Sequence, residues 1–228
     1  MNGRGQRGLW IALLLLCAIG AAAAIRRIVA VTTTPLAGSS PFASLDAHFD
    51  AKIGITLIHI VPSLAFVLLV PLQFVSSLRQ RHPKFHQWMG RVLMCLGSVA
   101  GISAVWLSAH PVGGIVEGTA TTFYGCFFLF SLSRAWFHIR NRRVELHRGW
   151  VIRMVAIALG AAATRPIIAV FFATSRLTGL LPEQFFGPAM WLGFTTSYVA
   201  GETWIRHMRP RLAGHTVRKT GRVPASAL

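Results

Sequence analysis

Acidic residues are scarce in this sequence: six Asp and Glu side chains stand against 23 Lys and Arg. Sites for Ca²⁺ or Mg²⁺ need several oxygen ligands, so this shortage argues against a divalent-cation site built from carboxylates. Charged residues of both signs make up 13% of the 228 residues, about half the share found in soluble domains. No hydrolase-type triad signature is present. If the protein is an enzyme, oxidoreductase chemistry is the class we expect.

Cysteine is equally rare. Cys17, Cys95 and Cys126 lie in separate apolar segments and form no CxxC pair, so we expect buried free thiols rather than a disulfide framework. A net charge of +17 is typical of some nucleic-acid-binding proteins, but neither a zinc-finger spacing nor an aromatic RNA-binding motif accompanies it. We therefore expect no nucleic-acid partner and assign the basic residues to loops at a membrane surface.

Long apolar runs dominate what remains, with 54% hydrophobic residues and a mean hydropathy of +0.56. A helix that crosses a membrane needs about 20 mostly apolar residues. The predicted fold class is an all-α, polytopic transmembrane helical bundle with about six spans, in contact with the lipid bilayer. The spans are expected at 9–31, 53–78, 91–109, 119–138, 150–174 and 188–205.

The runs divide the chain into four parts. Residues 1–31 form an N-terminal span, which is either a retained signal anchor or a signal peptide cleaved after the alanine run at 21–24. Residues 32–52 form an outer loop and 53–205 a five-span membrane core. Residues 206–228 form a basic cytoplasmic tail, for which polarity and charge predict disorder.

Lys and Arg are distributed unevenly between the two predicted sides. They concentrate before the first span, around 79–91 and 134–148, and in the C-terminal tail. Cytoplasmic loops carry such an excess. The sequence therefore predicts a multi-pass protein of the bacterial inner membrane with both termini in the cytoplasm.

Small residues recur four positions apart where helices are expected to touch. Such spacing lets backbones approach closely within lipid. The positions are Gly97 and Gly101, Gly160 and Thr164, and Gly193, Ser197 and Gly201.

Polar side chains inside the spans sort by depth into two groups. His59, His110 and Arg165 are expected near the outer side, whereas the inner side receives His86, His138, His147 and Arg153. Ionisable groups within spans are rare and mark functional sites by default. Two further polar residues, Gln73 and Glu202, lie on inward-facing stripes of the second and sixth spans.

Axial ligation of b-type haem is the function that this arrangement favours. Haem iron in a bundle takes imidazoles from facing helices, and its propionates favour nearby Arg. We expect His59 and His110 to ligate haem b near Arg165, and the inner pair His86 and His147 to do so near Arg153. In this hypothesis the four histidines are the metal ligands.

Structural interpretations compete with this hypothesis. The inner histidines also suit interfacial positions, and His110 suits a helix end. His59 would then bond a carbonyl freed by Pro62. Arg153 and Glu202 lie at matching depth, and an unpaired charge in the membrane is costly. We therefore expect these two residues to form an ion pair.

Two segments carry a family resemblance: "HQWMGR" (86–91) and "HRGWVIR" (147–153), each with a His, a Trp and then an Arg that enters an apolar run. Together with His59, Gln73 and Arg165 they resemble a family of predicted bacterial membrane proteins, domain of unknown function 2306, over about 53–205. Glu202 matches an acidic residue that the family has near the end of its last span, and Val151 replaces a frequent Met. The resemblance implies fold and membrane location and leaves the activity open.

Three functions therefore remain open at this point. The first is a haem-binding electron carrier that works with a redox partner protein or a quinone. The second is a proton-coupled small-molecule transporter that uses His59, Arg165 and Glu202 as a relay. The third is a non-catalytic membrane assembly partner. Sequence patterns leave the oligomeric state open.

Overall fold

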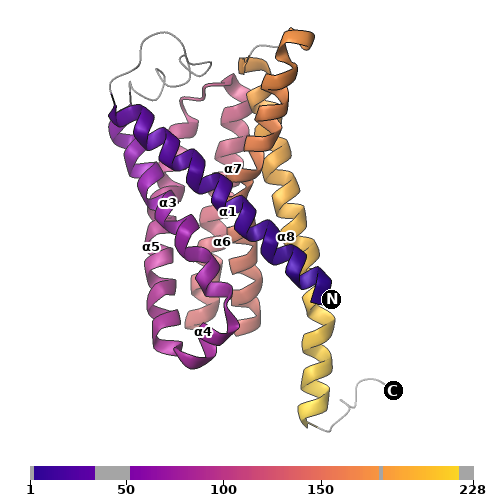
Figure 1. Cartoon of the computed structure of the whole chain (residues 1–228). Coiled ribbons are helices and arrows are strands. Elements are labelled where there is room, and N and C mark those ends of the chain that lie inside the picture. The colour runs from indigo at the N-terminus through magenta and orange to yellow at the C-terminus, as the bar shows by residue number, and fades with distance from the viewer. Residues whose placement is uncertain (1–2, 34–51, 180–181, 221–228) are drawn as a thin grey trace.

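The computed structural model describes residues 3–33, 52–179 and 182–220, and these residues form helices without any strand (Figure 1). The helices are α1 (Gly3–Thr32), α3 (Ile53–Phe74), α4 (Ser76–Arg81), α5 (Pro83–Ser108), α6 (Gly114–Arg140), α7 (Val144–Thr178) and α8 (Pro182–Thr220). The helices α1, α3, α5, α6 and α7 are long and apolar enough to cross a membrane. The predicted fold class, a helical membrane bundle, is confirmed.

Helix boundaries differ from the apolar runs at several points. The run 53–78 is divided, because Val75 has an extended backbone that ends α3 and precedes the short helix α4. Helices α5 and α7 begin at Pro83 and Val144, several residues before their apolar runs.

The sixth expected span, 188–205, lies within α8, which continues to Thr220. The prediction that disorder begins at residue 206 is therefore wrong for the first part of the tail. Arg, Met, Leu and Ala in that segment favour helix. Most of the predicted outer loop, 34–51, lies outside the described residues.

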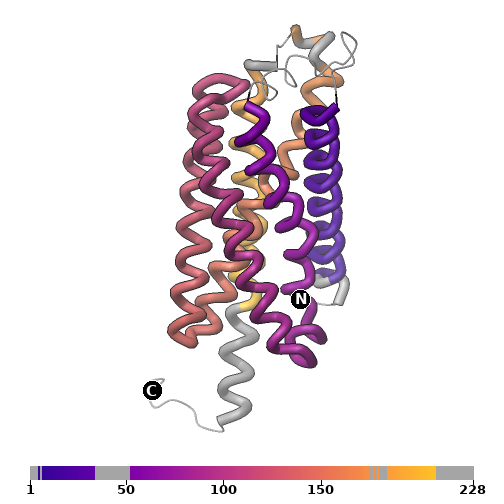
Figure 2. Tube along the Cα trace, turned by 90° about the vertical axis from the view of Figure 1, so that its left-hand side faces the viewer, coloured from indigo at the N-terminus to yellow at the C-terminus, as the bar shows by residue number. Residues whose placement is uncertain are grey.

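Chain connections alternate between two ends of the bundle. Helix α4 and the turn between α6 and α7 lie at one end, toward which the N-terminus and the last turns of α8 also point (Figures 1 and 2). We call this the inner end. The connection from α5 to α6 and the start of α8 lie at the opposite, outer end. This alternation matches the predicted grouping of the basic loops.

One core joins the N-terminal helix to the others. Leu13 and Cys17 of α1 are buried with Phe66 of α3, Phe128 of α6 and Ile157 of α7 in a single apolar cluster. Helix α1 packs against both α3 and α7. Helix α1 is therefore an integral part of this packing, and cleavage after the alanine run, which would remove Leu13 and Cys17 from it, stays a prediction.

The exterior of the bundle is apolar. Ile102, Phe123 and Leu192 are each more than half exposed, as expected for side chains that face lipid tails. Cys95 and Cys126 are free thiols that also face outward, whereas Cys17 is buried. The prediction of three buried thiols is thus wrong for two of them, because apolar sequence in a membrane protein does not distinguish core from lipid.

Small residues bring α7 and α8 together, as predicted. A Cβ atom on Gly193 would lie 2.8 Å from the backbone nitrogen of Thr164, and one on Gly160 would lie 2.9 Å from the Cα of Phe194. At the same interface, Ser197 donates a hydrogen bond of 2.6 Å to the carbonyl of Ala156. Gly97 and Gly101 similarly admit Leu132 and Leu129 of α6 against α5.

We expect Gly193→Ala to destabilise the bundle by about 1–3 kcal/mol, because overpacking forces two backbones apart. Thermal unfolding of the purified protein in detergent measures the effect. Gly54→Ala is the matched control, since a Cβ there meets nothing within 4 Å. Equal melting temperatures for the two variants would contradict the close approach.

Candidate functional site

A cavity of about 700 Å³ lies toward the outer end of the bundle. Its walls come from α1, α3, α5, α6, α7 and α8, and much of its lining is apolar. The charged or imidazole-bearing residues that line it are Arg26, Arg27, Lys52, His59, His110, Glu117 and Arg165. The structure thus brings together His59, His110 and Arg165, the three residues assigned to the outer group from sequence.

His59 has a defined orientation in this cavity. Its Nδ1 lies 3.0 Å from the carbonyl oxygen of Ala100 and 3.2 Å from the hydroxyl of Ser103, both on α5. A carbonyl can only accept a hydrogen bond, so Nδ1 carries the proton. In the neutral ring Nε2 then keeps its lone pair and is able to accept a proton or bind a metal.

The partner of His59 differs from the one that the structural interpretation named. Pro62 lies on the same helix, α3, whereas the accepting carbonyl belongs to Ala100 on α5. The hydroxyl of Ser103 itself donates to the carbonyls of Val99 at 2.6 Å and Ala100 at 3.0 Å. The imidazole is therefore held by a neighbouring helix rather than by a local kink.

Positive charge dominates the cavity. Arg165 lies within electrostatic range of Arg26 and Arg27 of α1 and of Glu117 of α6. The carboxylate of Glu117 accepts a hydrogen bond from the backbone N–H of Gly113 at the start of α6. Four cations thus line the cavity against this one carboxylate among its described lining residues.

Sequence reasoning missed the two arginines that helix α1 contributes to the lining of the outer cavity. Arg26 and Arg27 are not among the site residues predicted from sequence, yet both are on α1 and line the cavity. A signal was present in the sequence. Two adjacent arginines interrupt the apolar run 9–31, and charges within a span usually face the protein interior.

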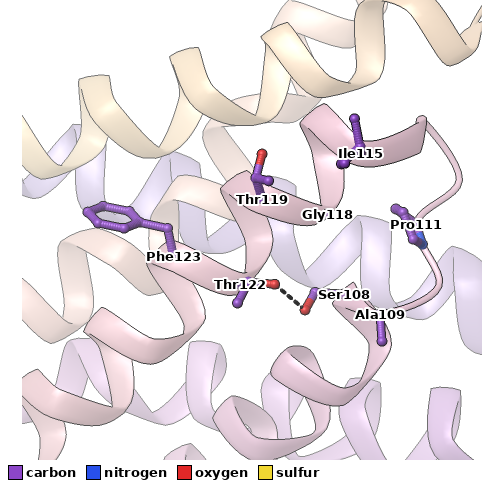
Figure 3. Close-up of a pocket in the computed structure, with 8 residues that line it drawn as sticks. All are labelled: Ser108, Ala109, Pro111, Ile115, Gly118, Thr119, Thr122 and Phe123. Carbon is purple, nitrogen blue, oxygen red and sulfur yellow. Dashed lines mark hydrogen bonds between the residues drawn. The ribbon is translucent and has the colours of Figure 1, made fainter.

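A second cavity of about 640 Å³ lies near the connection of α5 and α6 (Figure 3). Its lining is apolar apart from Ser108, Thr119 and Thr122, and it contains no ionisable side chain. Ser108 and Thr122 bond to each other at 2.6 Å, so these hydroxyls join the two helices. This cavity lacks groups for acid–base or redox chemistry.

At the inner end the structure gathers the other predicted histidines. Nδ1 of His147 lies 2.9 Å from the carbonyl of Ala135, so Nε2 again remains the acceptor. His86 and His138 each lie within electrostatic range of His147. His138 is 2% exposed and, among the described residues, neither of its ring nitrogens has a hydrogen-bond partner.

No metal cluster of the usual kind is formed by these groups. Within the described part of the chain, no set of three or more His, Cys, Asp or Glu side chains is placed to hold a metal ion. Ligation by pairs of histidines therefore stays a prediction for both groups. Gln73 donates to the backbone carbonyl of His86 at 3.4 Å and so links α3 to α5 near the inner end.

Arg153 and Glu202 form the predicted ion pair. The guanidinium donates through Nε and NH2 to the two carboxylate oxygens, the second contact being 3.1 Å long. Arg153 also lies 4.7 Å from the centre of the Trp150 ring, a cation–π distance. In the haem hypothesis a propionate of the inner haem balances the charge of Arg153. In the structure the carboxylate of Glu202 balances it.

The two motif segments lie at the inner starts of α5 and α7, and both fall inside a region with a family match. Residues 56–205 match the model of a family described as predicted membrane protein (DUF2306). The chain belongs to this family. Helix α1 and Lys52 precede the matched region. No curated protein and no solved structure matches the chain.

Removing one partner of the inner ion pair leaves the other charge uncompensated within the bundle. We expect Glu202→Gln and Arg153→Gln each to lower the free energy of unfolding by about 1–3 kcal/mol. The double variant should lose less than the two singles together, with a coupling energy of at least about 0.5 kcal/mol. Chemical denaturation of all three variants in detergent measures this cycle.

Glu145→Gln is the matched control, because Glu145 is an exposed carboxylate in the first turn of α7. It should change stability by less than about 0.5 kcal/mol. Strictly additive losses in the double variant would show that the two charges do not stabilise each other.

Proposed function

We propose that this integral membrane protein is a b-type cytochrome whose haem occupies the outer cavity. The observation that carries the proposal is the orientation of His59. Its Nδ1–H is held by the carbonyl of Ala100, so the opposite nitrogen of the neutral ring keeps its lone pair, and His59 lines the outer cavity. Metal-ligating histidines typically have their second nitrogen fixed in this way, which sets the tautomer and raises ligand basicity.

The other residues that line the outer cavity also suit haem b. Cavities that hold small molecules and cofactors span about 300–1,000 Å³ and are mostly apolar with a few placed polar groups, and this cavity measures about 700 Å³. His110 lines it as a candidate second ligand, with its ring 5.2 Å from that of Trp106. Arg165 would balance a propionate. Haem b in this site would supply one-electron transfer.

The residues of the chain would have distinct tasks in such a protein. His59 and His110 would bind the iron, and the apolar walls would exclude water, which tunes the potential. The electron would pass to a redox partner protein or a quinone. For the inner pair, His86 and His147, the fixed Nδ1 of His147 favours the same use of Nε2.

A proton-coupled transporter is supported less well. Two members of the suggested relay, His59 and Arg165, line the outer cavity, but Glu202 does not line it and is bonded to Arg153. The three groups therefore do not form one path among the described residues. A non-catalytic assembly partner would require no cavity lined by an oriented imidazole.

We further propose the bacterial inner membrane as the location, with the inner end of the bundle in the cytoplasm. The support is the concentration of Arg and Lys in the segments that meet at this end. An alkaline phosphatase fused after Leu228 should be inactive, whereas a fluorescent protein that folds in the cytoplasm should be bright there. Active phosphatase at this position would contradict the orientation.

Protein purified after expression with haem supplied should show a Soret band and a reduced-minus-oxidised difference spectrum of b-type haem. His59→Ala should remove most of the outer-site signal, because it deletes the ligand that Ala100 orients. Spectra at equal protein concentration measure the change. His147→Ala tests the inner pair in the same way.

His82→Ala is the matched control, because His82 is an exposed imidazole between α4 and α5. It should leave the spectrum unchanged. A colourless preparation that is well folded by circular dichroism would end the proposal. Colour that survives the combined His59→Ala and His147→Ala changes would do so as well.

A further inference from the structure

Trp150, on α7 near the inner end of the bundle, has two guanidinium groups over its ring. The Cζ of Arg153 lies 4.7 Å from the ring centre, and the Cζ of Arg134, on α6, lies 5.6 Å from it. Both are cation–π distances. The two groups differ in charge balance, because Arg153 is paired with Glu202, whereas Arg134 has no carboxylate partner among the described residues.

The Nε donor of Arg134 is also not used within the described part of the chain. This atom is buried and has no hydrogen-bond partner there, although the residue as a whole is only partly buried. A buried donor without a partner is costly. The planar guanidinium group matches a phosphate, to which it is able to donate two parallel hydrogen bonds.

Arg134 lies at a depth from which it reaches a lipid headgroup. It precedes Arg140, the last residue of α6, by six positions, or about 9 Å along the helix axis. The 27 residues of α6 span about 40 Å, whereas the hydrocarbon core of a bilayer is about 30 Å thick. The ends of α6 therefore project into the headgroup layers, and a long arginine side chain near one end extends to the phosphates.

A strip of phenylalanine rings continues from Arg134 along the exterior of α6. Phe123, Phe130 and Phe137 recur every seven residues and are each more than half exposed; we call them the phenylalanine strip. Arg134 is four residues after Phe130 and three before Phe137, so it lies on the same side of the helix. Its Cζ lies 5.8 Å from the centre of the Phe137 ring, and the Phe130 ring lies 5.4 Å from that of Trp150. The exterior of α6 thus combines an apolar strip with a cation at its inner end.

We infer that an anionic phospholipid binds along the phenylalanine strip, with its phosphate on Arg134 and one acyl chain against the rings. Basic sites between helices at the cytoplasmic surface typically bind such headgroups. The inference does not depend on haem, because neither Arg134 nor any residue of the strip lines the outer cavity.

The surroundings of Arg134 favour an anionic lipid over a zwitterionic one. Arg140, Arg142 and Arg143, at the end of α6 and in the following turn, are exposed and have no carboxylate partner among the described residues. Glu145, in the first turn of α7, offsets at most one of these charges. Each cation near a membrane surface attracts anionic lipid by about 1 kcal/mol, whereas the choline group of a zwitterionic lipid is itself positive.

The test measures lipid binding to the delipidated full-length protein by native mass spectrometry. Phosphatidylglycerol and phosphatidylcholine with the same acyl chains are the two probes. Phosphatidylglycerol should bind about tenfold tighter or more. Arg134→Gln should reduce this preference to about threefold or less, because Gln has no charge to pair with the phosphate. Phe130→Ala should weaken both lipids by a similar factor, because it removes contact with the shared acyl chain.

Arg81→Gln is the matched control, because Arg81 is an exposed arginine at the same end of the bundle, in the last turn of α4. It should keep the full preference. Arg134→Lys keeps the charge without the planar fork, so its preference should lie between those of the wild type and Arg134→Gln. Circular dichroism and unchanged affinity for phosphatidylcholine would show that the Arg134 variants are folded.

Four results would overturn the inference. Equal affinity of the wild-type protein for the two lipids is the first. A loss of preference in Arg81→Gln as large as in Arg134→Gln is the second, because it would show a general attraction by the basic end. Displacement of phosphatidylglycerol by inorganic phosphate would identify a soluble anion as the ligand. A dimer without bound lipid that Phe130→Ala dissociates would show that a second copy of the chain covers the strip.

Discussion

The absence of water inside a bilayer is the constraint on which this structure depends, because each polar group there must find its partner within the bundle. Four polar side chains satisfy this constraint by a hydrogen bond to a backbone carbonyl of a neighbouring helix. The pairs are His59 with Ala100, Gln73 with His86, His147 with Ala135 and Ser197 with Ala156. Arg153 and Glu202 satisfy it by pairing their opposite charges with each other. The polar groups thus act first as cross-links that fix which helix faces which.

At the outer cavity one of these cross-linking side chains also lines a candidate site. His59 lines the cavity and uses Nδ1 as a cross-link to α5, so in the neutral ring Nε2 is the nitrogen that keeps its lone pair. Ionisable side chains, among them His59, Arg165 and Glu117, line this cavity, whereas the described lining of the neighbouring cavity near Ser108 has none. This difference is why we place the proposed ligand in the outer cavity.

Much of the fold could be predicted from sequence because helices in lipid must be long and apolar and pack closely through small residues. Apolar length predicted the five helices that are long and apolar enough to cross a membrane. The small-residue spacing of Gly160, Gly193 and Gly201 predicted the contact of α7 with α8, and matching depth predicted the ion pair. Sequence could not show that His59 bonds to α5, since the choice of partner helix depends on rotation about the helix axis. Sequence also could not show that the side chains of Cys95 and Cys126 lie on the exterior of the bundle rather than in its core. The role of Arg26 and Arg27 was missed because a count of charges by side ignores where each side chain points.

The position of these two arginines has a consequence for how the protein is made. In the proposed orientation, α1 must carry both cations to the outer side of the membrane, against a potential that opposes each by about 2.3 kcal/mol per 100 mV. The distribution of charge along α1 therefore does not stabilise this orientation of the helix. The contacts of Leu13, Cys17 and Gly20 with the other helices supply that support only once the bundle has assembled. Biogenesis of this protein should thus be cooperative: α1 reaches its stable position only after helices that follow it in the chain have assembled around it.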